Sequence, residues 1–186
     1  LAMVLPLAGG ALAQAFPSKP IRIVVPFGAG GVADVTARTV GQKLSESLGQ
    51  AVVIENKPGA GGIAAGDIVA KAEPDGHTLL LMSNGTAVSA GLFKSLPFDT
   101  LRDFAPISTL GYFDIAIVTA AESRFKTLGD VLSYARANPG KLNFAAPQPN
   151  SLPHLAGELV SKAGDMNLFT VPYPGPPAAV TAVISG

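Results

Sequence analysis

A glycine-rich segment with the residue types of an anion-binding loop follows a short β-branched run. It reads Pro26-Phe-Gly-Ala-Gly-Gly-Val-Ala-Asp34 and precedes apolar residues at helical spacing. Glycines permit a tight turn that aims several backbone N–H groups at one point, and a helix start adds unpaired N–H groups and the positive end of its dipole. Such a loop can bind an anion without a basic side chain. The alternative is a plain strand-to-helix turn in which Asp34 stabilises the helix start.

Three further segments carry polar or turn-forming residues where ligands can bind. Gly59-Ala-Gly-Gly62 is a second glycine loop, which either widens the site or is only a tight turn. Ser83, Asn84 and Thr86 follow a predicted strand and offer neutral donors, or else satisfy their own backbone as a turn. Ser151 begins the helix that holds His154, so its hydroxyl can cap the helix, meet a ligand, or do both.

The composition argues against several classes of function. The 186 residues contain no cysteine and only two histidines, His77 and His154, neither of them in HExxH spacing. We therefore expect no metal, no cofactor, and no catalytic role for His154, since no acid and nucleophile accompany it. Thirteen basic residues balance thirteen acidic ones without clustering, which argues against nucleic acid as a partner.

An enzymatic alternative remains open from the residues alone. Gly28-Ala-Gly-Gly-Val-Ala33 satisfies G-x-G-x-x-A, and Glu55 ends the next predicted strand, where a ribose-binding acid would lie. A Rossmann-like dinucleotide-binding oxidoreductase is therefore the main alternative. Pro26-Phe27 before the glycines and the lack of a catalytic constellation weaken it. An exported hydrolase and a purely structural module are weaker still.

The hydrophobic periodicity predicts two α/β lobes built from successive strand–helix units. Strands are expected at 21–25, 51–55, 77–82, 113–119, 142–145 and 169–171, and helices at 32–48, 63–72, 127–138, 151–163 and 176–185. The alternation predicts parallel sheets, whose carboxyl edges usually hold the ligand. We assign residues 16–112 to the first lobe and 113–186 to the second, with a hinge near 110–120.

The first residues resemble an export signal. Leu1 to Ala13 is small and apolar, and Ala11-Leu-Ala13 is an A-x-A cleavage site. The run is shorter than the roughly 20 residues that span a bilayer. Residues 1–15 are therefore expected to be a signal-peptide remnant, without a cysteine to carry a lipid anchor.

Several strings, in order along the chain, resemble the Bug family, the TctC-like receptors of tripartite tricarboxylate transporters. They are the first glycine loop and the following strings: Val53-Ile-Glu-Asn-Lys-Pro-Gly-Ala-Gly-Gly62, Pro74-Asp-Gly-His-Thr-Leu-Leu-Leu81, Leu96-Pro-Phe-Asp99, Asp103-Phe-Ala-Pro106, Ala137-Asn-Pro-Gly-Lys141, His154-Leu-Ala-Gly-Glu158 and Val171-Pro-Tyr173. The resemblance runs from about Phe16 to Gly186.

The resemblance implies a two-lobed periplasmic-binding-protein fold (Venus-flytrap, type II-like). Such a receptor is expected to be a periplasmic monomer that binds a dicarboxylate, tricarboxylate, aromatic acid or amino acid and delivers it to membrane transporter subunits. Transferred to this sequence, the resemblance implies the following ligand-binding positions: Phe27, Gly30, Gly31, Val32, Ala33 and Asp34 on one lobe, Ser151 on the other, and the donors Ser83, Asn84 and Thr86.

The chain also departs from the family pattern. Val32 and Ala33 stand where Gly and Thr are common, and a loop usually rich in glycine and asparagine reads Pro147-Gln-Pro-Asn150. Fewer hydroxyls predict a site that relies more on backbone N–H groups and water. Family members continue for over a hundred further residues, so the second lobe is expected to be truncated and the chain, as written, poorly soluble or dynamic there.

Overall fold

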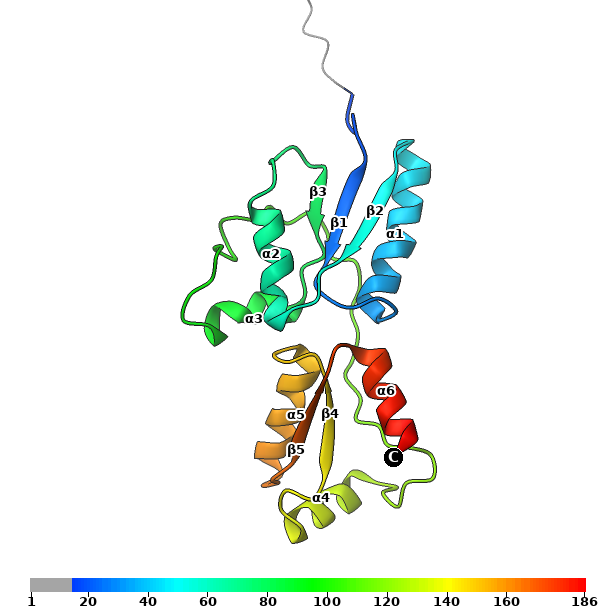
Figure 1. Cartoon of the computed structure of the whole chain (residues 1–186), viewed down its shortest axis with the longest axis vertical. Coiled ribbons are helices and arrows are strands. Elements are labelled where there is room, and N and C mark those ends of the chain that lie inside the picture. Colours follow the sequence, from blue (N-terminus) through cyan, green and yellow to red (C-terminus); the bar gives the residue numbers. More distant parts are fainter. Residues whose placement is uncertain (1–14) are drawn as a thin grey trace, which may run out of the picture.

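The computed structural model describes residues 15–186, which form two parallel β-sheets with helices packed beside them (Figure 1). The predicted signal-peptide run and its Ala11-Leu-Ala13 cleavage site lie outside the described residues. Within the described part, the mixed α/β architecture agrees with the predicted fold class.

The first sheet has the strand order β2-β1-β3, with all strands parallel. Its strands are β1 (Ile21–Val25), β2 (Val52–Asn56) and β3 (Thr78–Leu80), and its helices are α1 (Val32–Leu48), η1 (Ala60–Gly62), α2 (Ile63–Ala70) and α3 (Asn84–Leu92). The central strand β1 is a nearly continuous apolar run, in which Val24 and Val25 are fully buried. Such a run is typical of a parallel strand covered on both faces.

The second sheet pairs β4 (Asn143–Pro147) with β5 (Phe169–Tyr173), again in parallel. Around it lie α4 (Leu128–Ala137), α5 (Leu152–Ala163) and α6 (Pro176–Ser185). Helix α4 begins with a capping box, in which Thr127 accepts from the Asp130 N–H and Asp130 accepts from the Thr127 N–H. Below, "first lobe" means β1–β3 with α1–α3, and "second lobe" means β4–β5 with α4–α6.

The carboxyl ends of the two sheets face each other (Figure 1). The loop after β4 contacts the loop after β1: the Gln148 side chain donates to the Pro26 carbonyl oxygen. The loop after β5 also lies there, since an added Cβ at Gly28 would stand 3.6 Å from the Pro174 carbonyl oxygen. Helices that follow parallel strands begin at the carboxyl edge, so helix N-termini from both lobes meet at this junction.

Two sequence predictions differ from the structure. Residues 113–119 were expected to form a strand, but this stretch has no helix or strand assignment. Phe113 and Val118 within it are 60% and 63% exposed, so this apolar stretch packs on no neighbouring strand of the described residues. Ser83 to Thr86 was expected to be a loop, whereas α3 begins at Asn84 with Ser83 as its N-cap.

The turn before α2 requires glycine for two reasons. Gly62 has φ 73°, and an added Cβ would stand 2.5 Å from the Thr86 Oγ1 atom and 3.1 Å from the Pro26 Cβ atom. We expect Gly62→Ala to lower the free energy of unfolding by about 2–4 kcal/mol, since both backbone strain and overpacking oppose it. Urea denaturation followed by circular dichroism measures this change.

Gly49, the αL cap that ends α1, provides a matched control. Its φ is 67°, but an added Cβ would meet nothing within 4 Å. Gly49→Ala should therefore lower the free energy of unfolding by only about 1 kcal/mol, because backbone strain alone opposes it. Equal losses for the two variants would contradict the close packing of Gly62 beneath the loop after β1.

Candidate functional site

The loop between β1 and α1 presents backbone donors at the junction of the lobes. Gly31 is the N-cap of α1, with extended backbone (φ −83°, ψ 170°) and no side-chain cap. Its carbonyl oxygen accepts from the Val35 N–H at 3.0 Å, which starts the helical ladder. Among the described residues, the N–H groups of Gly31, Val32 and Ala33 have no hydrogen-bond partner. These three amides are the free donors of the helix start.

Asp34 holds this loop in place from within. Its side chain is buried, and its carboxylate accepts from the Gly30 N–H at 2.9 Å, the Arg38 Nε atom at 3.0 Å and the Asn56 Nδ2 atom at 2.9 Å. The same Asn56 amide donates to the Phe27 carbonyl oxygen at 3.0 Å. The Arg38 guanidinium, helped by these N–H donors, holds the pKa of Asp34 at about 2 against the opposing effect of burial.

The predicted residues of this loop therefore divide into two groups. Asp34 and the Gly30 N–H are used to shape the loop, whereas Gly31, Val32 and Ala33 keep their N–H groups free. Phe27 contributes its carbonyl oxygen to the Asn56 bond and packs its side chain against the core of β1.

The residues predicted after β3 lie at the start of α3. Ser83 caps the helix by accepting from the Thr86 N–H at 3.3 Å. Thr86 is fully buried beneath Gly62, whereas Asn84 is exposed. An added Cβ at Gly85 would lie 3.5 Å from the Asn150 carbonyl oxygen, so this helix start abuts the loop after β4. Thr86 thus contributes to the packing beneath the junction.

On the second lobe, Ser151 is occupied by its own loop. Its hydroxyl donates to the Pro147 carbonyl oxygen at 2.6 Å and accepts from the His154 N–H at 3.5 Å. The His154 Nδ1 atom accepts from the Asn150 N–H at 3.0 Å. These bonds make both side chains parts of an N-terminal cap for α5.

Prolines reduce the number of amide donors that the second lobe offers. Pro176 and Pro177 open α6, and Pro153 lies in the first turn of α5. Proline is tolerated in the first helical turn because its missing N–H would be unpaired there. The Cγ atoms of Pro176 and Pro177 would lie 3.5 Å from Cβ atoms added at Gly31 and Gly30, so the glycines before α1 lie against an apolar, donor-poor surface.

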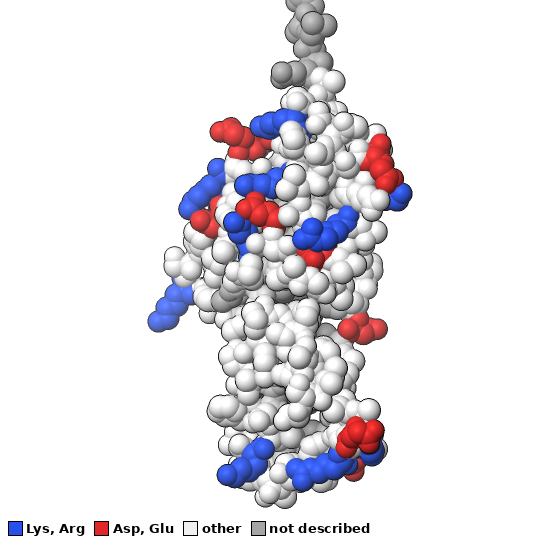
Figure 2. All heavy atoms as spheres, turned by 45° about the vertical axis from the view of Figure 1, so that its right-hand side comes forward, with Lys and Arg blue, Asp and Glu red and all other residues white. Residues whose placement is uncertain are grey.

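One face of the junction carries little charge. Figure 2 shows Lys, Arg, Asp and Glu spread over the first lobe and gathered at the far end of the second, with a largely uncharged surface near the junction on this face. An anion here would be held chiefly by backbone dipoles, as the glycine loop predicted.

Three contributors to this site were not singled out from the sequence. Arg38 could have been found, because it lies four residues after Asp34 on the same helix face. Asn56 could have been found too, since it ends β2 at the same sheet edge as the first glycine loop. Gln148 could not, because its contacts lie 122 and 89 residues away in the sequence.

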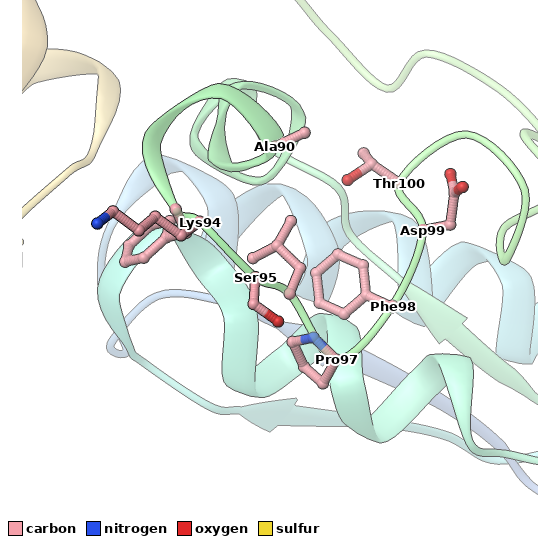
Figure 3. Close-up of a pocket in the computed structure, with 9 residues that line it drawn as sticks. Ala90, Lys94, Ser95, Pro97, Phe98, Asp99 and Thr100 are labelled. Carbon is pink, nitrogen blue, oxygen red and sulfur yellow. The ribbon is translucent and has the colours of Figure 1, made fainter.

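An open hollow of about 510 Å³ lies elsewhere on the first lobe, beyond the end of α3 (Figure 3). Phe93, Leu96, Pro97 and Phe98 line it together with the exposed Lys94. None of the predicted ligand-binding residues takes part. We regard the junction as the stronger candidate because free amides from a helix start converge there.

No described helix is both long and apolar enough to cross a bilayer. No group of three or more His, Asp or Glu side chains in this part of the chain is arranged to hold a metal ion.

Comparison with known proteins gives consistent matches. The model of the tripartite tricarboxylate transporter family receptor matches residues 36–186. A UPF0065 protein from the tcbD-tcbE intergenic region of Pseudomonas sp. strain P51 is 42% identical over 173 residues, which are 93% of this chain and 52% of that protein. Protein BugT of Bordetella pertussis is 35% identical over 182 residues, covering 97% of this chain and 56% of BugT.

A solved structure gives the same result. MatC from Rhodopseudomonas palustris with bound malate superposes with a TM-score of 0.84 at 32% identity, covering 92% of this chain and 58% of MatC. The chain thus spans about half the length of the curated relatives it matches.

The buried Asp34 network generates a prediction about stability and pH. The pKa of Asp34 falls from 3.8 to about 2 on folding, so the ionised carboxylate stabilises the fold at pH values above 3.8, and this stability is lost as pH falls through about 2. Asp34→Asn should lower the free energy of unfolding by about 2 kcal/mol at pH 7, because it removes the charge from the hydrogen bonds to Arg38 and Gly30. The difference from the unmodified chain should narrow between pH 4 and pH 2.

Asp67→Asn is the matched control for this measurement. Asp67 pairs with the exposed Lys71 one turn along α2 at 2.7 Å, and a partly exposed pair of this kind contributes about 0.5 kcal/mol. Chemical denaturation at pH 7 should give only a small effect for this variant. A loss for Asp34→Asn no larger than for Asp67→Asn would contradict the role given to Asp34.

Proposed function

The chain belongs to the tripartite tricarboxylate transporter receptor family, and on that premise we propose that it captures a small carboxylate between its two lobes and delivers it to a membrane transporter. The observation that carries this proposal is the set of unpaired amides of Gly31, Val32 and Ala33 at the junction. A carboxylate oxygen satisfies such donors and interacts favourably with the positive end of the α1 dipole.

The properties of a relative support the choice of a carboxylate. MatC, which shares the fold of this chain at 32% identity, was solved with malate. The prolines at the starts of α5 and α6 support different roles for the two lobes: the first lobe binds the carboxylate, and the second covers it with proline side chains.

Capture would proceed by closure of the lobes around the ligand. A ligand can drive closure only if it binds the closed form more tightly than the open form, which requires contacts with both lobes at once. The junction supplies neighbouring groups from both, since Gly31 lies against Pro176 and Gly85 against Asn150. The membrane transporter would then recognise the closed shape.

The proposed setting follows from the family and from the first residues. We place the receptor in the periplasm, as a monomer that meets its transporter subunits at the membrane, and we assign it no catalytic step. The apolar run before the A-x-A site supports export.

The dinucleotide-binding alternative has less support. In such a site Glu55 would accept from a ribose hydroxyl. Here the Glu55 carboxylate lies 2.8 Å from the Lys57 Nζ atom and 3.2 Å from the Arg22 Nη1 atom, and the Lys57 ammonium lowers the pKa of Glu55. Both oxygens already have cationic partners, so we favour the receptor.

A thermal-shift screen tests the function directly. At a concentration of 100 Kd, a carboxylate that binds only the folded chain should add about 2.7 kcal/mol of stability and raise Tm by about 5–10 °C. The methyl esters of the same acids should have little effect because they lack the negative charge. Stabilisation by NAD, with every carboxylate inert, would favour the oxidoreductase instead.

Removing one amide tests the site itself. Val32 is the first residue of α1, its side chain is 64% exposed, and Gly31 before it is extended, so proline fits there with little strain. Val32→Pro deletes one N–H and should weaken carboxylate binding by about 10- to 100-fold, as expected for a hydrogen bond to a charged group.

Val32→Ala is the control, because it trims the same side chain but keeps the N–H. Calorimetric titration should give it an affinity within about twofold of the unmodified chain. If proline and alanine at this position had equal effects, the backbone donor would not be part of the site.

A further inference from the structure

One side chain of the second lobe is bonded to both glycine loops of the first. The Gln148 Nε2 atom donates to the Pro26 carbonyl oxygen at 3.1 Å and to the Gly59 carbonyl oxygen at 2.6 Å. The side chain is 5% exposed. Its backbone N–H extends the second sheet by donating to the Tyr173 carbonyl oxygen at 2.7 Å. The backbone of Gln148 is therefore fixed in the second lobe, and its side-chain amide is bonded to the first lobe.

These contacts determine which atom of the Gln148 carboxamide is the nitrogen and which is the oxygen. Both partners are carbonyl oxygens, which only accept, so the group facing them must be the NH2. A flipped amide would place its oxygen against two other oxygens. The Oε1 atom therefore points away from the two carbonyls, and among residues 15–186 it is buried without a donor.

The placement of Gln148 is costly for the fold. Its φ is 65°, in the left-handed region that glycine adopts most easily. A buried acceptor without a donor is a second cost. Two unfavourable features in one buried residue at a ligand junction indicate a role beyond packing.

We propose that Gln148 is a specificity-determining residue, whose Oε1 atom accepts a hydrogen bond from a donor that the solute carries beside its carboxylate. This inference rests on the proposed receptor function. Nε2 and Oε1 share one carbon, so the acceptor lies next to the loop that begins at Pro26 and ends in the free amides of Gly31 and Val32. The favoured solute is a carboxylate with a hydroxyl or ammonium group.

The energetic reason for discrimination is the cost of an unpaired acceptor. A site that hydrogen-bonds a solute hydroxyl rejects the analogue without it, because the buried protein group is then left unpaired. A plain carboxylate would satisfy the amides of α1 but leave Oε1 without a donor.

Matched pairs of acids test the inference by calorimetric titration of the whole chain. The pairs are malate with succinate, lactate with propionate, and mandelate with phenylacetate, which differ only in one hydroxyl. In any pair that binds, the hydroxy acid should bind at least about tenfold more tightly to the unmodified chain. Gln148→Gly should reduce that ratio to about threefold or less, chiefly by weakening the hydroxy acid.

Asp165→Gly controls for the backbone. Asp165 lies between α5 and β5, away from the junction, with φ 51°, so this variant relieves similar strain while keeping the Gln148 amide, and its preference should equal that of the unmodified chain. Circular dichroism of each variant checks that it is folded, and Gln148→Ala repeats the test if the glycine variant is not.

The outcomes separate this inference from the function on which it rests. If carboxylates bind without a preference for the hydroxyl, or if Gln148→Gly keeps the preference, the role of Gln148 is wrong and a water satisfies Oε1, while the receptor function stands. If no acid of any pair and no amino acid binds, both proposals fail.

Discussion

Unpaired backbone N–H groups at a helix start need a partner, and this requirement organises the junction. The first turn of any helix leaves donors that its own ladder cannot use. In α1 the N-cap is a glycine without a side chain to accept from them, so Gly31, Val32 and Ala33 keep their donors free. Parallel strands place this helix start at the carboxyl edge of the first sheet, opposite the carboxyl edge of the second. The donors therefore lie between the lobes.

The loop can keep these donors free because Asp34 shapes it from inside. A carboxylate in the first turn would compete with a bound anion if it faced the junction. Instead it is buried and neutralised by Arg38, and among the backbone N–H groups of the loop it binds only that of Gly30. The negative charge of Asp34 therefore does not oppose the proposed binding of a carboxylate, since it is balanced within the loop by Arg38.

Local patterns predicted most of the fold. The β-branched run of β1, the helical spacing of α1 and the Gly49 cap all agree with the structure, because each depends on neighbouring residues. The prediction of a strand at 113–119 was wrong, because a strand requires a partner strand and its own residues do not specify one. Helix α3 was missed because its small residues, Asn84-Gly-Thr-Ala-Val-Ser-Ala-Gly-Leu92, have a weak apolar period. The tight loop between β1 and α1 was predictable from glycine spacing, but the long-range contacts of Gln148 were not.

Amide chemical shifts test the central claim most directly. In a 15N-labelled sample titrated with a carboxylate that binds, the Gly31, Val32 and Ala33 amide protons should move downfield, as expected when an N–H donates to a charged oxygen. The amide of Gly49, which is already bonded to the Ser45 carbonyl oxygen, should stay unchanged. Saturable binding that leaves the three α1 amides unmoved would contradict a site built on that helix start.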